Sequence, residues 1–492
     1  MSQNLPIKGL AALFALSAPL LARSPQAQRL DDRFEHPDGL AVTLWAESPL
    51  LYNPTAIDID GAGRVWVAEA VNYRKWGGRN PGREHPKGDR IVVLEDRDGD
   101  GVAEHSIVFA QDEELVAPLG LCVLPDGSVL VSCSPNLLLY RDTDGDLVAD
   151  SREVLLTGFG GLDHDHGLHS ATPTYDGRLL LVMGNAGPHV VEDKDGWNLR
   201  SSSYYRGGSP HNGANTPGLL SDDGRVHVGG LIVRMDMDGG GMSVIADNFR
   251  NVYEGTIDAF GRMYTEDNDD DGNRACRTLY VTEGGDYGYA SADGSRGWAA
   301  DERRGQERTV SHWHQDDPGV FPAGTINGAG GPTGVCIYEA GLPDDPMYAF
   351  NGAVLNADAG AGVVYAHFPR RKGAGVELQA SVLLGRGAKN VEGAGGQATW
   401  FRPSDVAVAP DGSILVADWY DPGVGGHGAG DREAYGRILR IQAASLADSP
   451  DARRLVLPPM EAEAEPFDDL LDALVSPAPA ARMVGFQGLA AA

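Results

Sequence analysis

The sequence predicts an all-β protein built as a six-bladed β-propeller. Glycine accounts for 66 of the 492 residues, which is well above its usual share of about 7%. Many tight turns between short strands are therefore expected. Segments in which apolar and polar residues alternate on both sides of an Asp-Gly or related turn recur along the chain, as in β-hairpins. One hairpin cannot bury both of its faces, so the recurrence predicts hairpins packed side by side around a common axis.

The recurring segments follow one another through most of the chain. They are Ile57–Glu69, Val123–Ser132, Pro173–Met183, Ile257–Glu266 and Val406–Asp418, with a degenerate copy in Val335–Asn356. A spacing of roughly 50–85 residues is too long for a solenoid repeat and suits four-stranded blades with inserted loops. The last strand is expected to end near Ile441, so the propeller is predicted over residues 36–441.

The two ends of the chain differ from the propeller in composition. Lys8 precedes an apolar run, Gly9–Ala22, which is shorter than the ~20 residues of a membrane-spanning helix and is typical of a signal peptide. Residues 1–27 are therefore predicted to direct export to the periplasm or the cell exterior, and no other stretch is apolar enough to span a membrane. At the other end, Leu455–Pro466 is predicted to be a linker. Residues 467–492 resemble the first helical pair of a HEAT-like repeat, which either caps the propeller or begins a longer array.

Charge and cysteine content exclude several classes of partner. The chain has 40 Lys and Arg residues against 70 Asp and Glu residues, a formal net charge of −30, which argues against nucleic acid or anionic lipid as the main partner. The four cysteines show no CxxCH spacing, so no covalent c-type haem is expected in this chain. Cys122 and Cys133 flank a predicted turn and are either a disulfide or two buried thiols.

Three Asp-rich turns carry oxygen ligands at the spacing of calcium-binding loops. Asp142, Asp144, Asp146, Asp150 and Glu153 occupy positions 1, 3, 5, 9 and 12 of an EF-hand-like loop. The same start recurs at Asp96, Asp98 and Asp100 and again at Asp267, Asp269 and Asp271. The pattern predicts Ca²⁺ clips between strands, or else tight hairpin turns in solvated loops.

A histidine-rich segment, Leu162–Ser170, precedes the third repeat and contains His164, His166 and His169. In a propeller such a loop lies at one end of the central channel. A histidine steered by a carboxylate can act as a general base; His-x-His with carboxylates can also bind Zn²⁺ or Fe²⁺. The remaining alternative is a hydrogen-bonded polar loop. A second polar cluster contains His312, His314, Asp316 and Asp317.

Several of these motifs occur in the order found in one enzyme family. Asp165 and His166, with His166 ten residues before Asp176, resemble the catalytic histidine loop of soluble quinoprotein glucose/sorbosone dehydrogenases. Arg250 and Asn251 resemble the pair that contacts the cofactor of this family, pyrroloquinoline quinone (PQQ). Glu283–Tyr289, which contains Gly285 and Tyr287, resembles a turn that holds an active-site Ca²⁺. Gly331–Gly341 resembles the loop before the fifth blade, and Arg402 resembles a late cofactor arginine.

The resemblance covers about residues 36–441 and departs from the family at two places. The family's lysine in the fifth blade falls within Asn356–Tyr365, which contains no Lys or Arg, and Ser404 stands where a second late arginine is expected. PQQ bears three carboxylates, so both departures remove partners for it. The order of the motifs is most similar to a planctomycete and verrucomicrobial group called membrane-bound dehydrogenases, whose members continue into HEAT repeats.

The resemblance implies an exported PQQ-dependent dehydrogenase that oxidises a hydroxyl group of a carbohydrate or polyol. His166 would abstract the hydroxyl proton, Asp165 would orient it, and Arg250, Asn251 and Arg402 would hold the cofactor. A c-type cytochrome would be the electron acceptor. Two other classes remain open: a Ca²⁺-dependent lactonase-like hydrolase, in which the metal polarises a carbonyl, and a non-catalytic scaffold that presents loops to partners.

Overall fold

The computed structural model describes most of the predicted propeller. The described residues are 27–73, 85–162, 166–203, 208–268, 274–297, 303–322, 324–341, 343–373, 375–387, 400–421, 433–447, 467–474, 482–483, 485–486 and 488–489. Residues 1–26 of the predicted signal peptide, the linker Leu455–Pro466, and the predicted site residues Asp165, Asp269 and Asp271 lie outside them.

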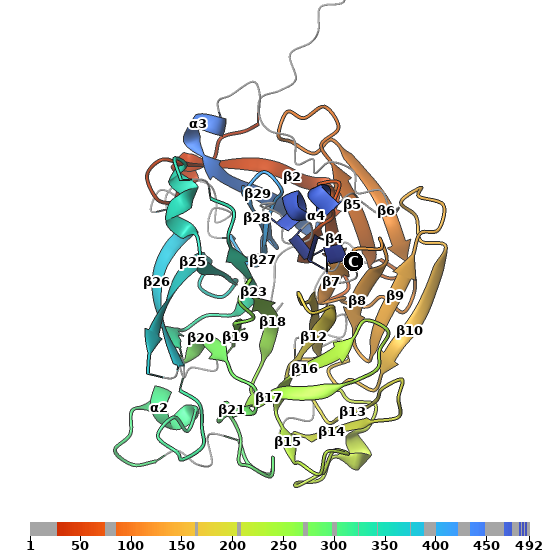
Figure 1. Ribbon diagram of the computed structural model, residues 1–492, viewed down its shortest axis with the longest axis vertical. Helices are drawn as coiled ribbons and strands as arrows, with labels where there is room; N and C mark the ends of the chain where they lie inside the picture. Colours follow the sequence, from red (N-terminus) through yellow and green to blue (C-terminus); the bar gives the residue numbers. More distant parts are fainter. Residues whose placement is uncertain are drawn as a thin grey trace, which may run out of the picture.

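Within these residues, six sheets of four or five strands surround a central channel (Figure 1). The first strand of each sheet in the ring, here called the inner strand, contacts the inner strands of both neighbouring sheets. The cycle runs through β3, β7, β11, β18, β23 and β27 and back to β3. The prediction of an all-β propeller is confirmed. We call the face where the inner strands begin the N-face and the face where they end the C-face.

The strands of the ring have the following bounds. The first sheet contains β3 (Pro54–Ile59), β4 (Val65–Glu69), β5 (Arg90–Glu95) and β6 (His105–Gln111). The second contains β7 (Gly120–Val123), β8 (Val129–Cys133), β9 (Asn136–Arg141) and β10 (Ser151–Thr157). The third contains β11 (Leu168–Pro173), β12 (Arg178–Met183), β16 (Gly230–Asp236), β17 (Ser243–Phe249) and β21 (Gly285–Asp286). The fourth contains β18 (Val252–Ile257), β19 (Met263–Asp267), β20 (Cys276–Val281) and β22 (Thr325–Gly328).

The remaining elements complete the ring and flank it. The fifth sheet contains β23 (Pro332–Tyr338), β24 (Ala353–Asp358), β25 (Val363–Lys372), β26 (Gly375–Arg386) and β1 (Phe34–Glu35). The sixth contains β27 (Pro403–Val408), β28 (Ile414–Asp418), β29 (Tyr435–Ala443) and β2 (Leu40–Tyr52). A small separate sheet contains β13 (His189–Glu192), β14 (Asn198–Ser202) and β15 (His227–Val228). The helices are η1 (Asp31–Arg33), η3 (Asn212–Ala214), α2 (Arg308–His312), η4 (Pro346–Phe350), α3 (Ala444–Ala447) and α4 (Phe467–Leu474).

The recurring Asp-Gly segments are the hairpins formed by the inner and second strands. In five of them the turn glycine has φ between +79° and +81°, a backbone conformation that favours glycine; these are Gly63, Gly127, Gly177, Gly261 and Gly412. The degenerate copy in Val335–Asn356 instead joins β23 to β24 through η4. All of these connections lie on the C-face, so the segments that lead into the inner strands lie on the N-face.

Apolar layers between neighbouring sheets form the core. Trp45 and Ile438 of the sixth sheet pack with Val67 and Val92 of the first, and equivalent layers join the first sheet to the second and the second to the third. The ring is closed by β2, which pairs antiparallel with β29 from Leu40↔Ala443 onward. Strands from the two ends of the propeller therefore share one sheet.

Buried carboxylates also join neighbouring inner strands around the channel. Asp58 accepts the Val123 N–H at 2.7 Å, Glu254 accepts the Val335 N–H at 2.6 Å, and Asp405 accepts the Ile57 N–H at 2.7 Å. Burial raises the pKa of Asp58 to about 6 and that of Asp405 to about 7. Burial, and next the charge of Asp405, raise the pKa of Glu254 well above its usual range. Protonation of these carboxyl groups therefore reduces the negative charge inside the channel.

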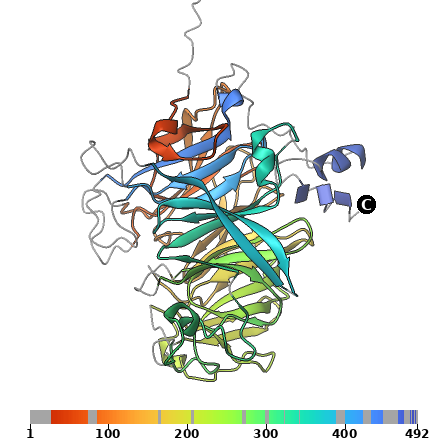
Figure 2. The same ribbon diagram turned by 90° about the vertical axis from the view of Figure 1, so that its left-hand side faces the viewer.

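The described part of the C-terminal helical segment lies on the C-face side of the ring (Figures 1 and 2). Its residues are 467–474, 482–483, 485–486 and 488–489. Arg482 forms a 3.0 Å ion pair with Glu339, the residue after β23, and the Phe486 ring meets the Tyr175 ring edge-on at 6.3 Å. No helix in the described part of the chain is long and apolar enough to span a lipid bilayer.

Cys122 and Cys133 are free, buried thiols. The alternative of a disulfide between them is wrong. They lie on neighbouring strands of the second sheet, where Cys122 pairs with Leu130 and Cys133 pairs with Asn136, so the two are not cross-strand partners.

Candidate functional site

Four predicted site residues lie on the N-face, immediately before inner strands. His166 precedes β11, Arg250 and Asn251 precede β18, and Arg402 precedes β27. All four side chains are buried. The hairpin repeat explains this placement, since residues at the same position of successive repeats meet at the same end of the channel.

His166 is oriented by Asn185, which follows β12. The two side chains are joined by a 2.6 Å hydrogen bond between His166 Nδ1 and Asn185 Oδ1. An amide oxygen only accepts, so Nδ1 carries the proton and Nε2 carries the basic lone pair. The Asn185 N–H donates to the Arg250 carbonyl at 2.8 Å, and the Ala186 N–H donates to the His166 carbonyl at 3.0 Å. The segment after β12 therefore connects His166 with Arg250.

Gly184 permits the close approach of these groups. A Cβ at this position would lie 2.4 Å from Asn251 Oδ1 and 2.8 Å from the His166 Cα, so a larger residue would displace both. His189 fixes the peptide by a 2.8 Å hydrogen bond from Nε2 to the Gly184 carbonyl. Burial lowers the pKa of His189 to about 4, so it is a neutral structural group at physiological pH.

The Arg250–Asn251 pair is held mainly through its backbone. Both N–H groups donate to Asp267, at 3.2 Å from Arg250 and 2.7 Å from Asn251. Arg250 Nη1 donates to the backbone and side-chain oxygens of Asn268, at 2.9 and 3.1 Å. Among the described residues no donor reaches the buried Oδ1 of Asn251, which leaves that atom as a hydrogen-bond acceptor beside His166.

The sixth and fifth sheets contribute different chemistry to the N-face. The Arg402 N–H donates to Asp418 at 2.8 Å, and its Nη1 donates to the Phe401 carbonyl at 3.3 Å. In the fifth sheet, where the family resemblance implies a lysine, Asp358 is fully buried and accepts the Gly331 N–H at 2.7 Å. The described part of the fifth sheet therefore has a carboxylate in the region where the resemblance implies a lysine.

The turn that contains Gly285 and Tyr287 is anchored to the strand that ends at Phe249. The Tyr287 N–H donates to the Asp247 carbonyl at 3.0 Å, and the Tyr287 ring stacks on Phe249 with a centroid distance of 4.3 Å. The hydroxyl donates to the Tyr280 carbonyl at 2.8 Å. The Tyr287 side chain is therefore part of the core and is not available to a ligand.

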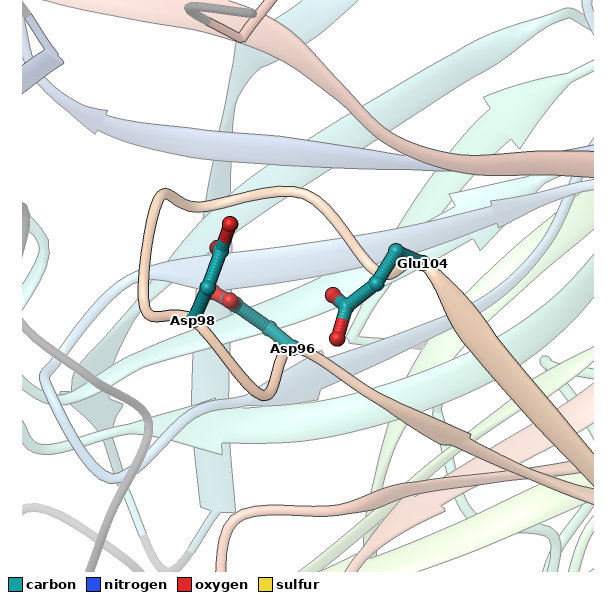
Figure 3. Close-up of side chains that lie close together, drawn as sticks. All are labelled: Asp96, Asp98 and Glu104. Carbon is teal, nitrogen blue, oxygen red and sulfur yellow. The ribbon is translucent and has the colours of Figure 1, made fainter. Parts of the chain in front are cut away.

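Two of the three Asp-rich turns form compact groups of oxygen atoms. Asp96, Asp98 and Glu104 each place a carboxylate oxygen within 4.8 Å of the other two (Figure 3). Asp142, Asp144 and Asp146 do the same. Both loops join the third and fourth strands of a sheet on the C-face. Each could hold a hard cation such as Ca²⁺.

The two loops have matching hydrogen bonds. Asp96 accepts the Gly99 and Gly101 N–H groups at 2.7 and 2.9 Å, and Asp142 accepts the Gly145 and Leu147 N–H groups at 2.7 and 2.8 Å. These bonds close the turns without a metal, so the geometry is compatible with both predicted alternatives.

Other predicted ligands are not brought to these groups. Asp100 accepts the Val102 N–H at 2.9 Å and Asp150 accepts the Thr143 N–H at 2.7 Å. Glu153 lies on β10 and pairs with Arg141 at 3.2 Å. Asp267 lies on the N-face and binds the backbone of Arg250 and Asn251. Sequence spacing alone did not reveal these partners.

The second histidine cluster packs beside the fourth sheet. His314 Nδ1 bonds to the Gly288 carbonyl, and the His312 ring lies 4.3 Å from the Trp313 ring. Asp317 pairs with Arg303, with 2.6 Å between Nη2 and Oδ2. The His314 contact holds the segment after α2 against the turn that contains Tyr287.

A cavity of about 170 Å³ lies in the C-face half of the channel. The later residues of all six inner strands line it, together with Arg482 and Met483 of the C-terminal segment. Asp58 and Glu254 contribute carboxyl groups to its wall. His166 lies at the opposite end of β11, so this cavity is separate from the N-face site.

A closed ring of mainly antiparallel sheets, with polar groups gathered where the inner strands begin, defines a β-propeller with a site at one end of its channel. The chain belongs to the family described as a domain of unknown function, DUF7133, whose model matches residues 26–425. No curated protein matches the sequence.

Solved structures share the fold at low sequence identity. The holo form of the pyranose dehydrogenase PQQ domain from Coprinopsis cinerea is 16% identical with a TM-score of 0.54, covering 85% of this chain and 99% of that one. The PQQ-bound aldose sugar dehydrogenase from Streptomyces coelicolor is 15% identical with a TM-score of 0.52, covering 83% and 99%. The calcium structure of a Trichoderma reesei carbohydrate-active enzyme of family AA12 is 14% identical with a TM-score of 0.51, covering 86% and 100%.

Proposed function

We propose that this protein is an exported oxidoreductase of the quinoprotein type that oxidises a hydroxyl group of a sugar or polyol. The main support is the His166–Asn185 pair beside Arg250 and Asn251 at the N-face. A base with a fixed tautomer, next to cationic and amide groups, suits proton abstraction beside an acidic cofactor. Solved structures with the same fold include PQQ-bound sugar dehydrogenases, which is consistent with this chemistry.

The N-face residues fit part of PQQ. The guanidinium groups of Arg250 and Arg402 suit two carboxylates, and the buried Oδ1 of Asn251 suits a hydrogen-bond donor of a ligand. Asp358 does not suit the third carboxylate. When bound, the quinone supplies an acceptor for two electrons and a proton. We assign cofactor contacts to Arg250, Asn251 and Arg402, and a backbone role to the turn containing Gly285 and Tyr287.

In this proposal His166 accepts the hydroxyl proton at Nε2. Asn185 holds the imidazole ring and keeps the proton on Nδ1. Because Asn185 is neutral, it orients His166 without stabilising the imidazolium by charge. The predicted role of Asp165 as a carboxylate next to the base remains part of the proposal, since Asp165 lies outside the described residues.

Titration of the purified protein with PQQ in the presence of Ca²⁺ tests the assignment. We expect binding at micromolar concentration, and we expect Arg250→Ala to weaken it about 10- to 100-fold because a charge-assisted hydrogen bond is lost. Arg225→Ala, which changes an exposed arginine, is the control and should bind normally. A wild-type protein that binds no PQQ but hydrolyses a lactone in the presence of Ca²⁺ would favour the hydrolase class instead.

Calcium is proposed as a structural ligand of the two C-face loops. Ca²⁺ should raise the melting temperature by several degrees, since a ligand at 100 times its Kd stabilises the folded state by about 2.7 kcal/mol. The double variant Asp96→Asn/Asp142→Asn should lose this shift, whereas Asp126→Asn in an exposed turn should keep it. An unchanged melting temperature after addition of a chelator and then of Ca²⁺ would refute the proposal.

The remaining assignments also rest on sequence features. The apolar run Gly9–Ala22 supports export, and the resemblance to quinoprotein dehydrogenases is the ground for proposing a c-type cytochrome as electron acceptor. The motif order supports a relationship to the planctomycete and verrucomicrobial membrane-bound dehydrogenases. The apolar periodicity of residues 467–492 supports a HEAT-like helical pair.

A further inference from the structure

A buried carboxylate ends the second strand in four of the six sheets. These residues are Glu69 of β4, Asp267 of β19, Asp358 of β24 and Asp418 of β28, and each is 0% exposed. The second strands run toward the N-face, so the four carboxylates lie at the level where the inner strands begin. Desolvation of a carboxylate is costly, so this recurrence requires specific partners.

Each carboxylate accepts a backbone N–H from the segment that leads into the inner strand of its own sheet. The donors are Tyr52 to Glu69 at 2.9 Å, Asn251 to Asp267 at 2.7 Å, Gly331 to Asp358 at 2.7 Å, and Arg402 to Asp418 at 2.8 Å. Asp267 also accepts the Arg250 N–H. A charged acceptor at this peptide fixes its plane, and with it the direction in which the adjoining side chain leaves the backbone.

Three of the carboxylates have an arginine partner on the third strand. The pairs are Glu69–Arg90 at 2.6 Å, Asp267–Arg277 at 2.9 Å and Asp418–Arg437 at 2.7 Å. In the last two pairs the arginine lies directly opposite the carboxylate in the strand register. The arginine supplies a counter-charge next to the buried carboxylate that holds the backbone amides.

The pair in the fourth sheet also reaches the turn that contains Tyr287. Arg277 is fully buried, its guanidinium lies 3.5 Å from the centre of the Trp313 ring, and Nη2 donates to the Tyr287 carbonyl at 2.8 Å. One ion pair therefore connects the backbone of Arg250 and Asn251 with the backbone of the neighbouring turn.

The geometry points to Asp267–Arg277 and Asp418–Arg437 as positioning pairs that direct Arg250, Asn251 and Arg402 toward the acidic cofactor. This inference rests on the proposed function for its cofactor. The pairs touch no cofactor themselves and act through the backbone amides that they hold. Glu69–Arg90 is built in the same way but holds Tyr52, to which no ligand contact is assigned, so the chain contains its own matched control.

The test compares Asp267→Asn, Asp418→Asn and Glu69→Gln in the full-length protein. Each variant removes one buried charge, so all three should lower the melting temperature. Only Asp267→Asn and Asp418→Asn should weaken PQQ binding, by about tenfold or more, because a charge-assisted hydrogen bond to a site amide is lost. Hydrogen–deuterium exchange provides a readout without cofactor: amides 250 and 251 should exchange at least tenfold faster in Asp267→Asn, and amide 402 in Asp418→Asn.

A double variant, Asp267→Asn/Arg277→Met, separates positioning from folding. It removes both charges, so it should recover most of the melting temperature while PQQ affinity and protection of amides 250 and 251 stay low. If the melting temperature, the PQQ affinity and the exchange protection all recover in the double variant, the inference is wrong. Equal PQQ affinities in the three single variants would also overturn it. If the wild-type protein binds no PQQ, the proposed function fails. In that case hydrogen–deuterium exchange still tests the positioning role. Unchanged exchange of amides 250 and 251 in Asp267→Asn and of amide 402 in Asp418→Asn would overturn it, and faster exchange would uphold it.

Discussion

Replacing His166 with alanine should lower the turnover of sugar oxidation by about 10²–10⁴-fold, the usual contribution of a positioned general base. PQQ affinity should change little, because cofactor binding is assigned to Arg250, Asn251 and Arg402. Steady-state turnover with an artificial electron acceptor, together with a PQQ titration, measures the two effects separately. Unchanged turnover in His166→Ala would exclude His166 as the base even if PQQ binds.

Two further variants sharpen this result. Asn185→Asp places a carboxylate at the 2.6 Å contact with His166 Nδ1, so it should raise the pKa of His166 and shift the acidic limb of the pH–rate profile upward. His105→Ala, on β6 at the C-face, is the control and should leave the turnover and the profile unchanged. A profile that does not move in Asn185→Asp would argue that another group is the titrating base.

Raising the pH from 5 to 8 should lower the free energy of unfolding by a few kcal/mol through the channel carboxyl groups. Burial raises the pKa of Asp405 to about 7 and that of Asp58 to about 6, and each pKa unit corresponds to about 1.4 kcal/mol. The unfolded chain releases these protons near pH 4, whereas the folded protein keeps them. Their contribution to stability is therefore complete below the unfolded pKa and is lost as the pH rises through the folded pKa.

Asp405→Asn should flatten this pH dependence. An asparagine keeps one side-chain oxygen, which can serve only one of the Ile57 and Val406 N–H groups that Asp405 binds through Oδ2 and Oδ1, but it has no charge to expose as the pH rises. Denaturant unfolding at pH 5, 6.5 and 8 measures the effect, and Asp126→Asn in an exposed C-face turn is the control. A slope in Asp405→Asn equal to that of the wild type would show that other groups cause the dependence.

The hairpin repeats made the fold predictable. Each repeat, such as Ile57–Glu69, shows the alternation of the strand residues and the position of the turn glycine. Because each turn lies on the same face, the repeats also indicate the direction of the strands. His166, Arg250 and Arg402 could therefore be placed at one end of the channel from their positions relative to the repeats. The closing role of β2 had no such signal, because a lone apolar strand does not indicate which partner it pairs with.

The partners of the site residues were less predictable. Asn185 lies 19 residues after His166, beyond a hairpin, and nothing in the sequence distinguishes it from a polar residue of a loop. Glu69 and Asp418 end two of the repeats, but nothing in the repeat pattern marked them as buried acceptors of backbone N–H groups. Their arginine partners depend on the register of the third strand, which the sequence pattern does not determine. The same limit applies to Asp267, whose Asp-rich context indicated a metal and not a backbone contact.

Closure of the ring by β2 and β29 also determines when the fold can be completed on the ribosome. Leu40 emerges early and its partner Ala443 emerges near the end of the propeller. At a synthesis rate of about 5–20 residues per second, β2 waits roughly 20–80 s for its partner. During this interval the nascent chain presents an unpaired edge strand, which can pair with other chains. Translation time therefore sets the earliest moment at which the last sheet can form.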